Sequence, residues 1–210
     1  MCGKFLISIS LAFSVAAYAQ QKDTFIDSRD GKKYKTVKIG EQVWMAENLN
    51  YKIGNSVCYD NKPENCQKYG RLYDWTTAIS GICPKGWHIP TNTEWDELYH
   101  YVDGTSGTKS PYESKTAGKY LKAKSGWNDY KGNGEDTYGF SALPGGEGPD
   151  DKGYLDVNFY GIGDYGSWWS ASETGNKYNA YRRYMGYNDG AFWSGIAKLF
   201  KYSVRCVEGE

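Results

Sequence analysis

Aromatic rings set among polar, glycine-rich stretches are the side chains of this sequence best suited to hold a ligand. Sugar-binding sites combine an aromatic surface, which packs on the C–H groups of a sugar ring, with amide and carboxylate groups that bind its hydroxyls. Both kinds of side chain occur together in the second half of the chain: Trp127, Asp129, Tyr138, Tyr165, Asn188, Asp189 and Trp193. We therefore expect a binding site for polysaccharide or for a cell-surface partner in this part of the chain.

Catalytic groups are scarce by comparison. His88 and His100 are the only imidazoles, and no G-x-S-x-G motif supplies an activated serine. His88 lies between Trp87 and Ile89, where a packed structural histidine is expected, and Glu94 is accounted for by a helix cap. Carboxylate pairs for glycoside hydrolysis stay open, because the sequence does not give the ~5–9.5 Å separations on which that chemistry depends. We expect a protein that is not an enzyme.

Four cysteines lie beyond the first twenty residues, and their even number favours two disulfides formed in an oxidising compartment. The sequence alone permits three connectivities. Cys58 and Cys66 bracket the polar stretch YDNKPEN, so the simplest pairing joins Cys58 to Cys66 and Cys83 to Cys206. A metal site or a catalytic thiol is the alternative, but no spacing resembles C-x-x-C.

Residues 1–19 have the layout of a secretory signal peptide, which leaves residues 20–210 as the expected mature domain. Lys4 precedes an apolar stretch from Phe5 to Ala17, which is too short to span a bilayer and leads into an A-x-A cleavage site. We expect a secreted or cell-envelope protein with no transmembrane segment after cleavage. The formal net charge is 0, so the sequence lacks the excess of basic side chains that is typical of nucleic-acid-binding proteins.

The expected mature domain is short of aliphatic side chains, with 22 Leu, Ile and Val residues against 32 aromatic ones. Many rings must therefore belong to the core, which is the competing interpretation of the ring-rich loops. Trp168 and Trp169 are neighbours on a predicted strand and point to opposite faces. One is expected in the core, and the other faces either a ligand or the second side of the sheet. Arg182 and Arg183 are also neighbours on a predicted strand, so they too are expected to point to opposite faces.

The first half of the chain predicts short strands followed by helices. Residues 24–51 are typical of short strands joined by tight turns, and residues 52–69 of a loop that carries the small disulfide. Leucine, tryptophan and isoleucine at helical intervals predict a helix over residues 70–80. Thr91 and Glu94 form the capping box of a second helix.

The second half predicts less regular structure and then strands. Residues 113–124 predict a third, shorter helix, and residues 125–166 a long irregular stretch of the kind that often carries function. Asn188-Asp189-Gly190 predicts a hairpin turn. Strands are predicted at 168–172, 180–187 and 196–207.

Six motifs, in this order, resemble the Fibrobacter succinogenes major paralogous domain family: DGKKYKTVKIGEQVWMAENLNY, YGRLYDWTTAI, CPKGWHIPTNTEWDEL, GFSALPGG, WWSASE and SVRCV. They extend from about residue 26 to residue 207. More distantly, the HIPT stretch at residues 88–91 with Glu94-Trp95, and the closing SVRCV, are similar to the superfamily of formylglycine-generating enzymes and C-type-lectin-like domains. That resemblance implies N- and C-terminal strands that lie close together and a loop-rich half that carries the binding surface.

The resemblance does not extend to catalysis. Formylglycine-generating enzymes work through a pair of thiols near the C-terminal part, whereas this chain has only Cys206 there, with a better use in a disulfide. We therefore expect an α+β, C-type-lectin-like single domain with short antiparallel strands, two to three helices and long Gly-rich loops. Its expected role is an exported, non-catalytic binding or adhesion module. The alternatives are a structural cell-envelope protein without a small ligand and a divergent enzyme.

The superfamily resemblance also raises the question of calcium. Trp127-Asn128-Asp129 copies a lectin calcium motif, but it follows the third predicted helix instead of preceding the last strand. Two loop groups offer oxygen ligands: Asp129, Asn133, Glu135 and Asp136, and further on Glu147, Asp150 and Asp151. Neither has the D-x-[DN]-x-[DN]-G order of a calcium loop. We expect solvated turn carboxylates and no cofactor, with calcium as the alternative.

Overall fold

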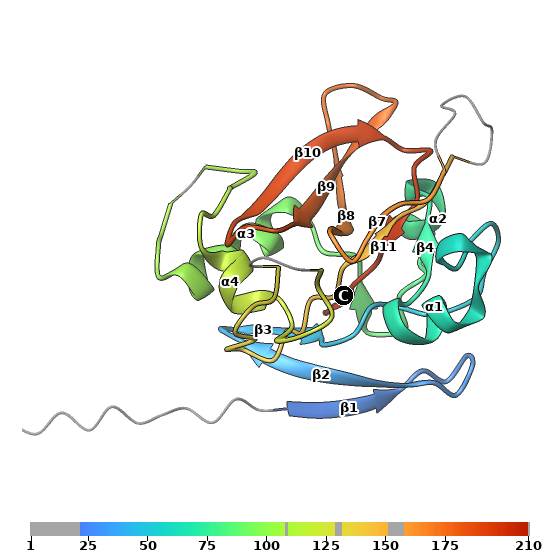
Figure 1. The fold of residues 1–210 in the computed structure, drawn as a ribbon, viewed down its shortest axis with the longest axis horizontal. Helices are drawn as coiled ribbons and strands as arrows, with labels where there is room; N and C mark the ends of the chain where they lie inside the picture. The colour runs from blue at the N-terminus through green and yellow to red at the C-terminus, as the bar shows by residue number, and fades with distance from the viewer. Residues whose placement is uncertain (1–21, 108, 129–131, 151–157, 210) are drawn as a thin grey trace, which may run out of the picture.

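The computed structural model describes residues 22–107, 109–128, 132–150 and 158–209. These residues form an α+β fold in which two β-sheets are combined with four short α-helices (Figure 1). The helices are α1 (Pro63–Tyr69), α2 (Trp75–Ile79), α3 (Asn92–Asp103) and α4 (Ala117–Leu121). Within the described residues, none of the helices has the length and apolar character needed to cross a membrane.

The first sheet joins the two ends of the chain. Its five strands lie in the order β1-β2-β3-β12-β5. They are β1 (Lys22–Ile26), β2 (Lys33–Ile39), β3 (Gln42–Met45), β5 (Trp87–His88) and β12 (Val207–Glu208). Val207 lies opposite Trp44 on one side and His88 on the other, so β12 is inserted between β3 and β5. The expectation that N- and C-terminal strands lie close together is thereby confirmed.

The second sheet is built mainly from the C-terminal third of the chain. Its strands lie in the order β10-β9-β8-β11-β4, and β6 and β7 are attached beside β8. They are β4 (Leu72–Tyr73), β6 (Gly145–Glu147), β7 (Tyr160–Ile162), β8 (Gly166–Glu173), β9 (Asn179–Met185), β10 (Ala191–Ala197) and β11 (Tyr202–Ser203). The predicted hairpin turn at 188–190 connects β9 to β10, which pair in antiparallel register.

Two apolar clusters form the core, and β8 contributes to both. Trp168 and Trp169 point to opposite faces of that strand, and both are fully buried, one in each cluster. Trp168 Nε1 donates to Asn48 Oδ1 at 2.8 Å, and Trp169 Nε1 donates to the Tyr73 carbonyl at 2.7 Å. The second ring therefore covers the other side of the sheet and is closed to a ligand.

Two predicted segments in the first half of the chain differ in detail. The segment 70–80 begins with β4, and its helix α2 starts only at Trp75, because the Asp74 carboxylate caps it by accepting the Thr77 amide. The expected loop 52–69 contains α1, which begins at Pro63, a residue suited to a first helical turn.

The final predicted strand is broken in the structure. Residues 196–207 do not form one strand, because β10 begins earlier, at Ala191, and the chain then crosses from the second sheet to the first. During this crossing the Val204 and Cys206 carbonyls accept hydrogen bonds from the Leu49 and Met45 amides. Both side chains stay in the second core cluster, as expected for residues two positions apart on the predicted strand. The irregular segment 125–166 likewise holds β6 and β7.

The predicted disulfide pairing is confirmed. Cys58 bonds to Cys66, and Cys83 bonds to Cys206. The second bond joins residues 123 positions apart and ties the segment before β5 to the segment before β12.

The capping box at the start of α3 is present as predicted. Thr91 Oγ1 accepts the Glu94 amide at 3.3 Å, and Glu94 Oε2 accepts the Thr91 amide at 2.8 Å. We expect Thr91→Ala to lower the free energy of unfolding by about 1 kcal/mol, measured by urea denaturation. Thr93→Ala is the matched control, because Thr93 is exposed in the same turn and caps nothing. Equal losses in both variants would contradict the cap.

Candidate functional site

The seven side chains predicted to bind a ligand do not form one site. Trp127 belongs to the core: it is 6% exposed and packs in the first cluster, and its Nε1 donates to the Ala142 carbonyl at 3.0 Å. A ligand cannot reach this ring, so Trp127 is corrected to a packing residue. Asp129 lies outside the described residues.

Three of the predicted residues lie in one neighbourhood near the β9–β10 turn. Tyr165 packs its ring against Gly186, where an added Cβ would come within 3.1 Å of the ring. Lys122 is buried beneath the turn and donates to the Gly186 and Asn188 carbonyls at 2.9 and 2.7 Å. Asn188 and Asp189 are themselves exposed. Lys122 thus fixes the backbone of the turn from the protein interior, while the Asn188 and Asp189 side chains face solvent.

Tyr138 and Trp193 lie apart from this neighbourhood. Tyr138 packs edge-on against Tyr101 and Tyr120, with ring centroids 5.8 and 6.5 Å apart, beside α3 and α4. Trp193 packs against Tyr181 at 5.4 Å on the face of β10 opposite to that of its neighbour Phe192. Neither ring contributes to the surface that contains Tyr165.

Arg182, on β9, is the centre of a polar cluster. This cluster lies on the face of the second sheet opposite to that of Trp193. Its Nη1 donates to Glu147 Oε2 at 2.9 Å and to the Tyr202 hydroxyl at 3.1 Å, and its Nε donates to Ser194 Oγ at 2.9 Å. The Arg182 and Glu147 side chains are 19% and 16% exposed. The ion pair therefore reaches the surface but is largely enclosed by its neighbours.

Aromatic rings flank this ion pair on the β9–β10 side. Tyr184 lies opposite Phe192 in the strand register, with ring centroids 5.5 Å apart. Because Arg182 and Tyr184 are two residues apart on one strand, they share a face. The Arg182 guanidinium lies 5.0 Å from the Tyr184 ring centroid, a cation–π distance.

Two more aromatic rings flank the Arg182–Glu147 ion pair on the β6–β7 side. Glu147 lies opposite Tyr160 in the β6–β7 register, and Tyr160 stacks on Tyr165 with centroids 6.1 Å apart. Tyr160 is 59% exposed. Burial raises the pKa of Tyr165, and the nearby acidic groups Asp164 and Glu147 act in the same direction, so its hydroxyl stays protonated at neutral pH.

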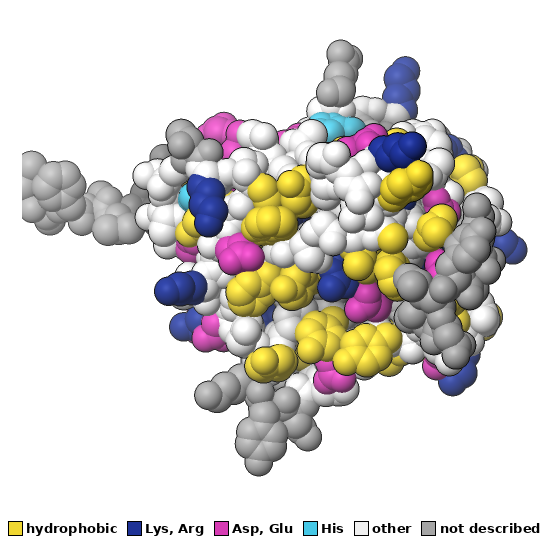
Figure 2. Space-filling view, turned by 90° about the horizontal axis from the view of Figure 1, so that it is seen from above, with side chains coloured by type: hydrophobic (Ala, Val, Ile, Leu, Met, Phe, Trp, Pro, Cys, Tyr) yellow, Lys and Arg dark blue, Asp and Glu magenta, His cyan; other side chains and the backbone are white. Residues whose placement is uncertain are grey.

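We define the aromatic face as the six side chains that surround and include this ion pair: Glu147, Tyr160, Tyr165, Arg182, Tyr184 and Phe192. Figure 2 views the molecule from the side on which β9 and β10 lie in Figure 1, and shows separate groups of hydrophobic side chains with basic and acidic side chains between them. The one arginine and one glutamate cancel in charge. The face therefore suits a ligand that is rich in hydroxyl groups and carries no charge.

Of the aromatic face, only Tyr165 is among the side chains predicted to bind a ligand. Arg182 was expected to face the opposite side of its strand from Arg183, and Glu147 was considered only as a calcium ligand. Two signals were present: Arg182 and Tyr184 alternate on a predicted strand, and the predicted turn at 188–190 brings Phe192 opposite Tyr184. No sequence pattern joins Glu147 to Arg182, because β6 reaches this face by pairing with β8 rather than with β9.

The candidate calcium ligands are engaged by other groups of the protein. Asp136 accepts the Ser141 amide and hydroxyl, both at 2.7 Å, and Glu135 pairs with Lys119 at 3.1 Å. Asn133 accepts the Trp127 amide, and Glu147 pairs with Arg182. Asp150 is buried and also has a partner, whereas Asp129 and Asp151 lie outside the described residues. Among the described residues, no group of three or more His, Cys, Asp or Glu side chains is arranged to hold a metal ion.

The two histidines are held by neighbouring side chains. His88 Nε2 lies 2.6 Å from Glu94 Oε1, so the capping glutamate also fixes the imidazole of β5. His100 stacks on Tyr112 with centroids 4.0 Å apart, and its Nδ1 lies 2.8 Å from the Thr105 hydroxyl. Both contacts are of the kind that hold a packed histidine in place.

The fold and site define a disulfide-linked α+β domain that presents an aromatic face of no net charge. The chain belongs to the Fibrobacter succinogenes major domain family, whose model matches residues 37–208. No curated protein matches the chain, and no solved structure matches it. Family membership agrees with the resemblance of the sequence motifs and assigns no activity by itself.

Proposed function

We propose that this protein is an exported, non-catalytic binding module that holds a neutral polysaccharide chain on the aromatic face. The observation that carries the proposal is the Arg182–Glu147 ion pair set among rings that are partly exposed. The rings offer apolar surface to the C–H groups of sugar rings, and the ion pair offers charge-assisted hydrogen bonds to hydroxyl groups.

The arrangement supports an extended ligand rather than a single small molecule. The rings come from two pairs of strands, with Tyr184 and Phe192 on β9–β10 and Tyr160 beside Tyr165 on β6–β7. The ion pair links the two pairs of strands, because Arg182 belongs to β9 and Glu147 to β6. A polymer that crosses the face would meet rings, then polar groups, then rings again.

Export and fold type form the second part of the proposal. Two disulfides are typical of proteins made in an oxidising compartment and support export through the signal-like segment at residues 1–19. A C-type-lectin-like architecture is supported by the insertion of β12 between β3 and β5 and by the loop-rich half that carries the aromatic face.

Tyr184→Ala is the sharpest test of this proposal. We expect the variant to bind insoluble xylan or cellulose about tenfold more weakly than the wild type, because one ring platform beside Arg182 is lost. Binding is measured by depletion of the protein from solution over a range of polysaccharide concentrations. Tyr178→Ala is the matched control, since Tyr178 is 68% exposed and lies outside the aromatic face.

Three outcomes are informative. Weakened binding by Tyr184→Ala with an unchanged control supports the proposal, provided that the melting temperature of the variant stays near that of the wild type. Equal binding by both variants contradicts it. No retention of the wild-type protein on any neutral polysaccharide would leave the structural cell-envelope protein as the favoured function.

A further inference from the structure

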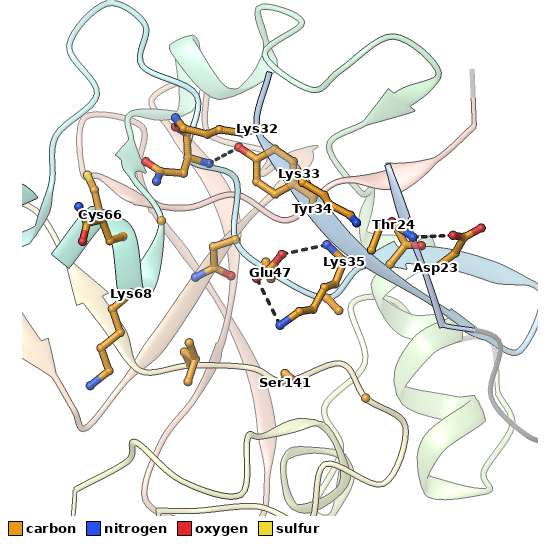
Figure 3. A pocket seen from close by; sticks show the side chains of 18 residues that line it. Asp23, Thr24, Lys32, Lys33, Tyr34, Lys35, Glu47, Cys66, Lys68 and Ser141 are labelled. Carbon is orange, nitrogen blue, oxygen red and sulfur yellow. Dashed lines mark hydrogen bonds and ion pairs between the residues drawn. The ribbon is translucent and has the colours of Figure 1, made fainter. Parts of the chain in front are cut away.

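A separate groove lies between the first sheet and the loop that contains residues 139–143. It has a volume of about 890 Å³, and its walls come from β1, β2, the segment 46–50, α1 and that loop. Figure 3 shows Lys35 and Glu47 at its middle, Lys68 at one end and Ser141 on the opposite wall. None of the six residues of the aromatic face lines it.

Basic side chains outnumber acidic ones along this groove. Its lining includes Lys32, Lys33, Lys35 and Lys68, against Asp23 and Glu47. Lys32 pairs with Asp30 at 3.1 Å, and Lys35 lies 3.9 Å from Glu47. Within the described part of the chain, neither the exposed Lys33 ammonium nor the Lys68 ammonium makes an ion pair, and Lys68 Nζ lies 4.8 Å from the Tyr69 ring centroid. Two cations are thus free to meet a ligand.

A buried cation lies directly beneath the groove floor. Arg205 is 1% exposed, and its Nε and Nη2 donate to Asn48 Oδ1 at 3.1 and 2.8 Å, while its Nη1 donates to the Phe140 carbonyl. Asn48 lines the groove, and so do Gly139 and Ser141, the residues on either side of Phe140. Burial lowers the pKa of Arg205 to about 9, which still leaves the group charged at neutral pH.

The Arg205 charge has no carboxylate in contact with it among the described residues, because all of its hydrogen bonds go to neutral oxygens. Asp136 and Glu47 act on it only at longer range. A buried cation without an ion-pair partner projects its field farther than a surface charge, since little solvent screens it. The floor of the groove is therefore positive beyond what its lining lysines supply.

The β2 wall of the groove offers side chains rather than free backbone groups. The β2 backbone is paired with β1 on one side and with β3 on the other, and Glu47 Oε2 accepts the Lys35 amide at 2.8 Å. A peptide therefore cannot add to β2 as a strand. The groove lining also contains hydroxyl and amide side chains, among them Thr24, Asn50, Gln67 and Ser141. This mixture suits a ligand that alternates carboxylates with hydroxyl groups.

We propose that this groove binds a carboxylate-bearing polysaccharide, whose acidic groups meet Lys33 and Lys68 over the positive floor. The site is independent of the aromatic face, which is neutral and involves other strands. Glu47 opposes the ligand, because its carboxylate lies in the groove beside Lys35. The chain would then hold a polymer with acidic units at one surface and neutral units at the other.

The test uses the whole protein and polygalacturonate as the probe, with binding measured by titration calorimetry in 50 mM salt. Lys33→Ala/Lys68→Ala is expected to weaken binding about tenfold or more, and Glu47→Gln to strengthen it severalfold. Lys115→Ala is the matched control, since Lys115 is exposed and lies outside the groove. All four substituted side chains lie at the surface, so these variants are expected to fold.

Fully methyl-esterified polygalacturonate keeps the sugar chain and removes its charge, so it is expected not to bind. Binding of the charged polymer is expected to disappear in 500 mM salt. Failure of the wild type to bind polygalacturonate, or an unchanged affinity in the double lysine variant, overturns the proposal. Equal binding of polyglutamate overturns the sugar component and makes an acidic peptide the ligand. Tyr184→Ala is expected to leave all these affinities unchanged, which separates this site from the aromatic face.

Discussion

Replacing Cys83 and Cys206 together by alanine is expected to lower the free energy of unfolding by about 4–5 kcal/mol. The bond closes a loop of 123 residues, and a loop of that length removes much of the conformational freedom of the unfolded chain. Cys206 is fully buried, so the variant also loses packing in the second core cluster. Urea denaturation without reductant measures the loss.

The second disulfide provides a matched comparison. Cys58 and Cys66 are 8 residues apart, so removing that bond is expected to cost about 2–3 kcal/mol on the same chain-entropy argument. The two double variants differ mainly in loop length and in burial. A larger loss for the Cys58/Cys66 variant than for the Cys83/Cys206 variant would contradict the assignment of the long bond as the main covalent constraint of the fold.

Asn48→Ala is expected to cost about 3–5 kcal/mol, although only one small side chain is removed. Asn48 Oδ1 accepts from Trp168 Nε1 and from two nitrogens of Arg205, and its Nδ2 donates to the Tyr69 carbonyl at 2.8 Å. Without that oxygen, the buried Arg205 guanidinium loses two of its three hydrogen bonds. Urea denaturation, followed by circular dichroism, measures the change.

Two further variants isolate the cause. Asn50→Ala is the matched control: its half-buried side chain lines the same groove, and a change within about 0.5 kcal/mol is expected. Combining Asn48→Ala with Arg205→Met is expected to cost less than the sum of the single losses, because no buried charge is then left unpaired. Additive losses would mean that Asn48 acts through packing alone.

Local chemistry made several features predictable from the sequence. The Thr91/Glu94 capping box lies within four consecutive residues and needs no distant partner. The turn at 188–190 is equally local, since its Asn-Asp-Gly composition favours the backbone geometry of a hairpin. The disulfide pairing was predictable because Cys58 and Cys66 bracket one short loop, which left Cys83 and Cys206 to pair with each other.

The final segment shows where local patterns fail. Val204 and Cys206 lie two positions apart on a predicted strand and so share a face, and both are buried. The same pattern could not reveal that the chain changes sheets there, because that change depends on hydrogen bonds to Met45 and Leu49, about 160 residues earlier. The charge of Arg205 lay in the SVRCV motif, but its partner Asn48 is 157 positions away.

The aromatic face illustrates the same division. The abundance of rings was evident in the composition, yet burial separated them: Trp127 is enclosed by core side chains, and Tyr184 borders a surface ion pair. Residues on one strand share a face through backbone periodicity, so the Arg182–Tyr184 pair was within reach of the sequence. Glu147 joins them only because β6 pairs with β8.

The sequence by itself determined the family, the capped helix and the hairpin turn, because each depends on motif identity or on residues that are close in the chain. It also favoured one disulfide pairing among three, because Cys58 and Cys66 bracket a short loop and leave Cys83 and Cys206 to each other. The tertiary structure alone decided which rings reach solvent, which charges are buried and which loops enclose a groove. Those properties depend on contacts between segments far apart in sequence, and no local pattern of side chains encodes how such segments pack together.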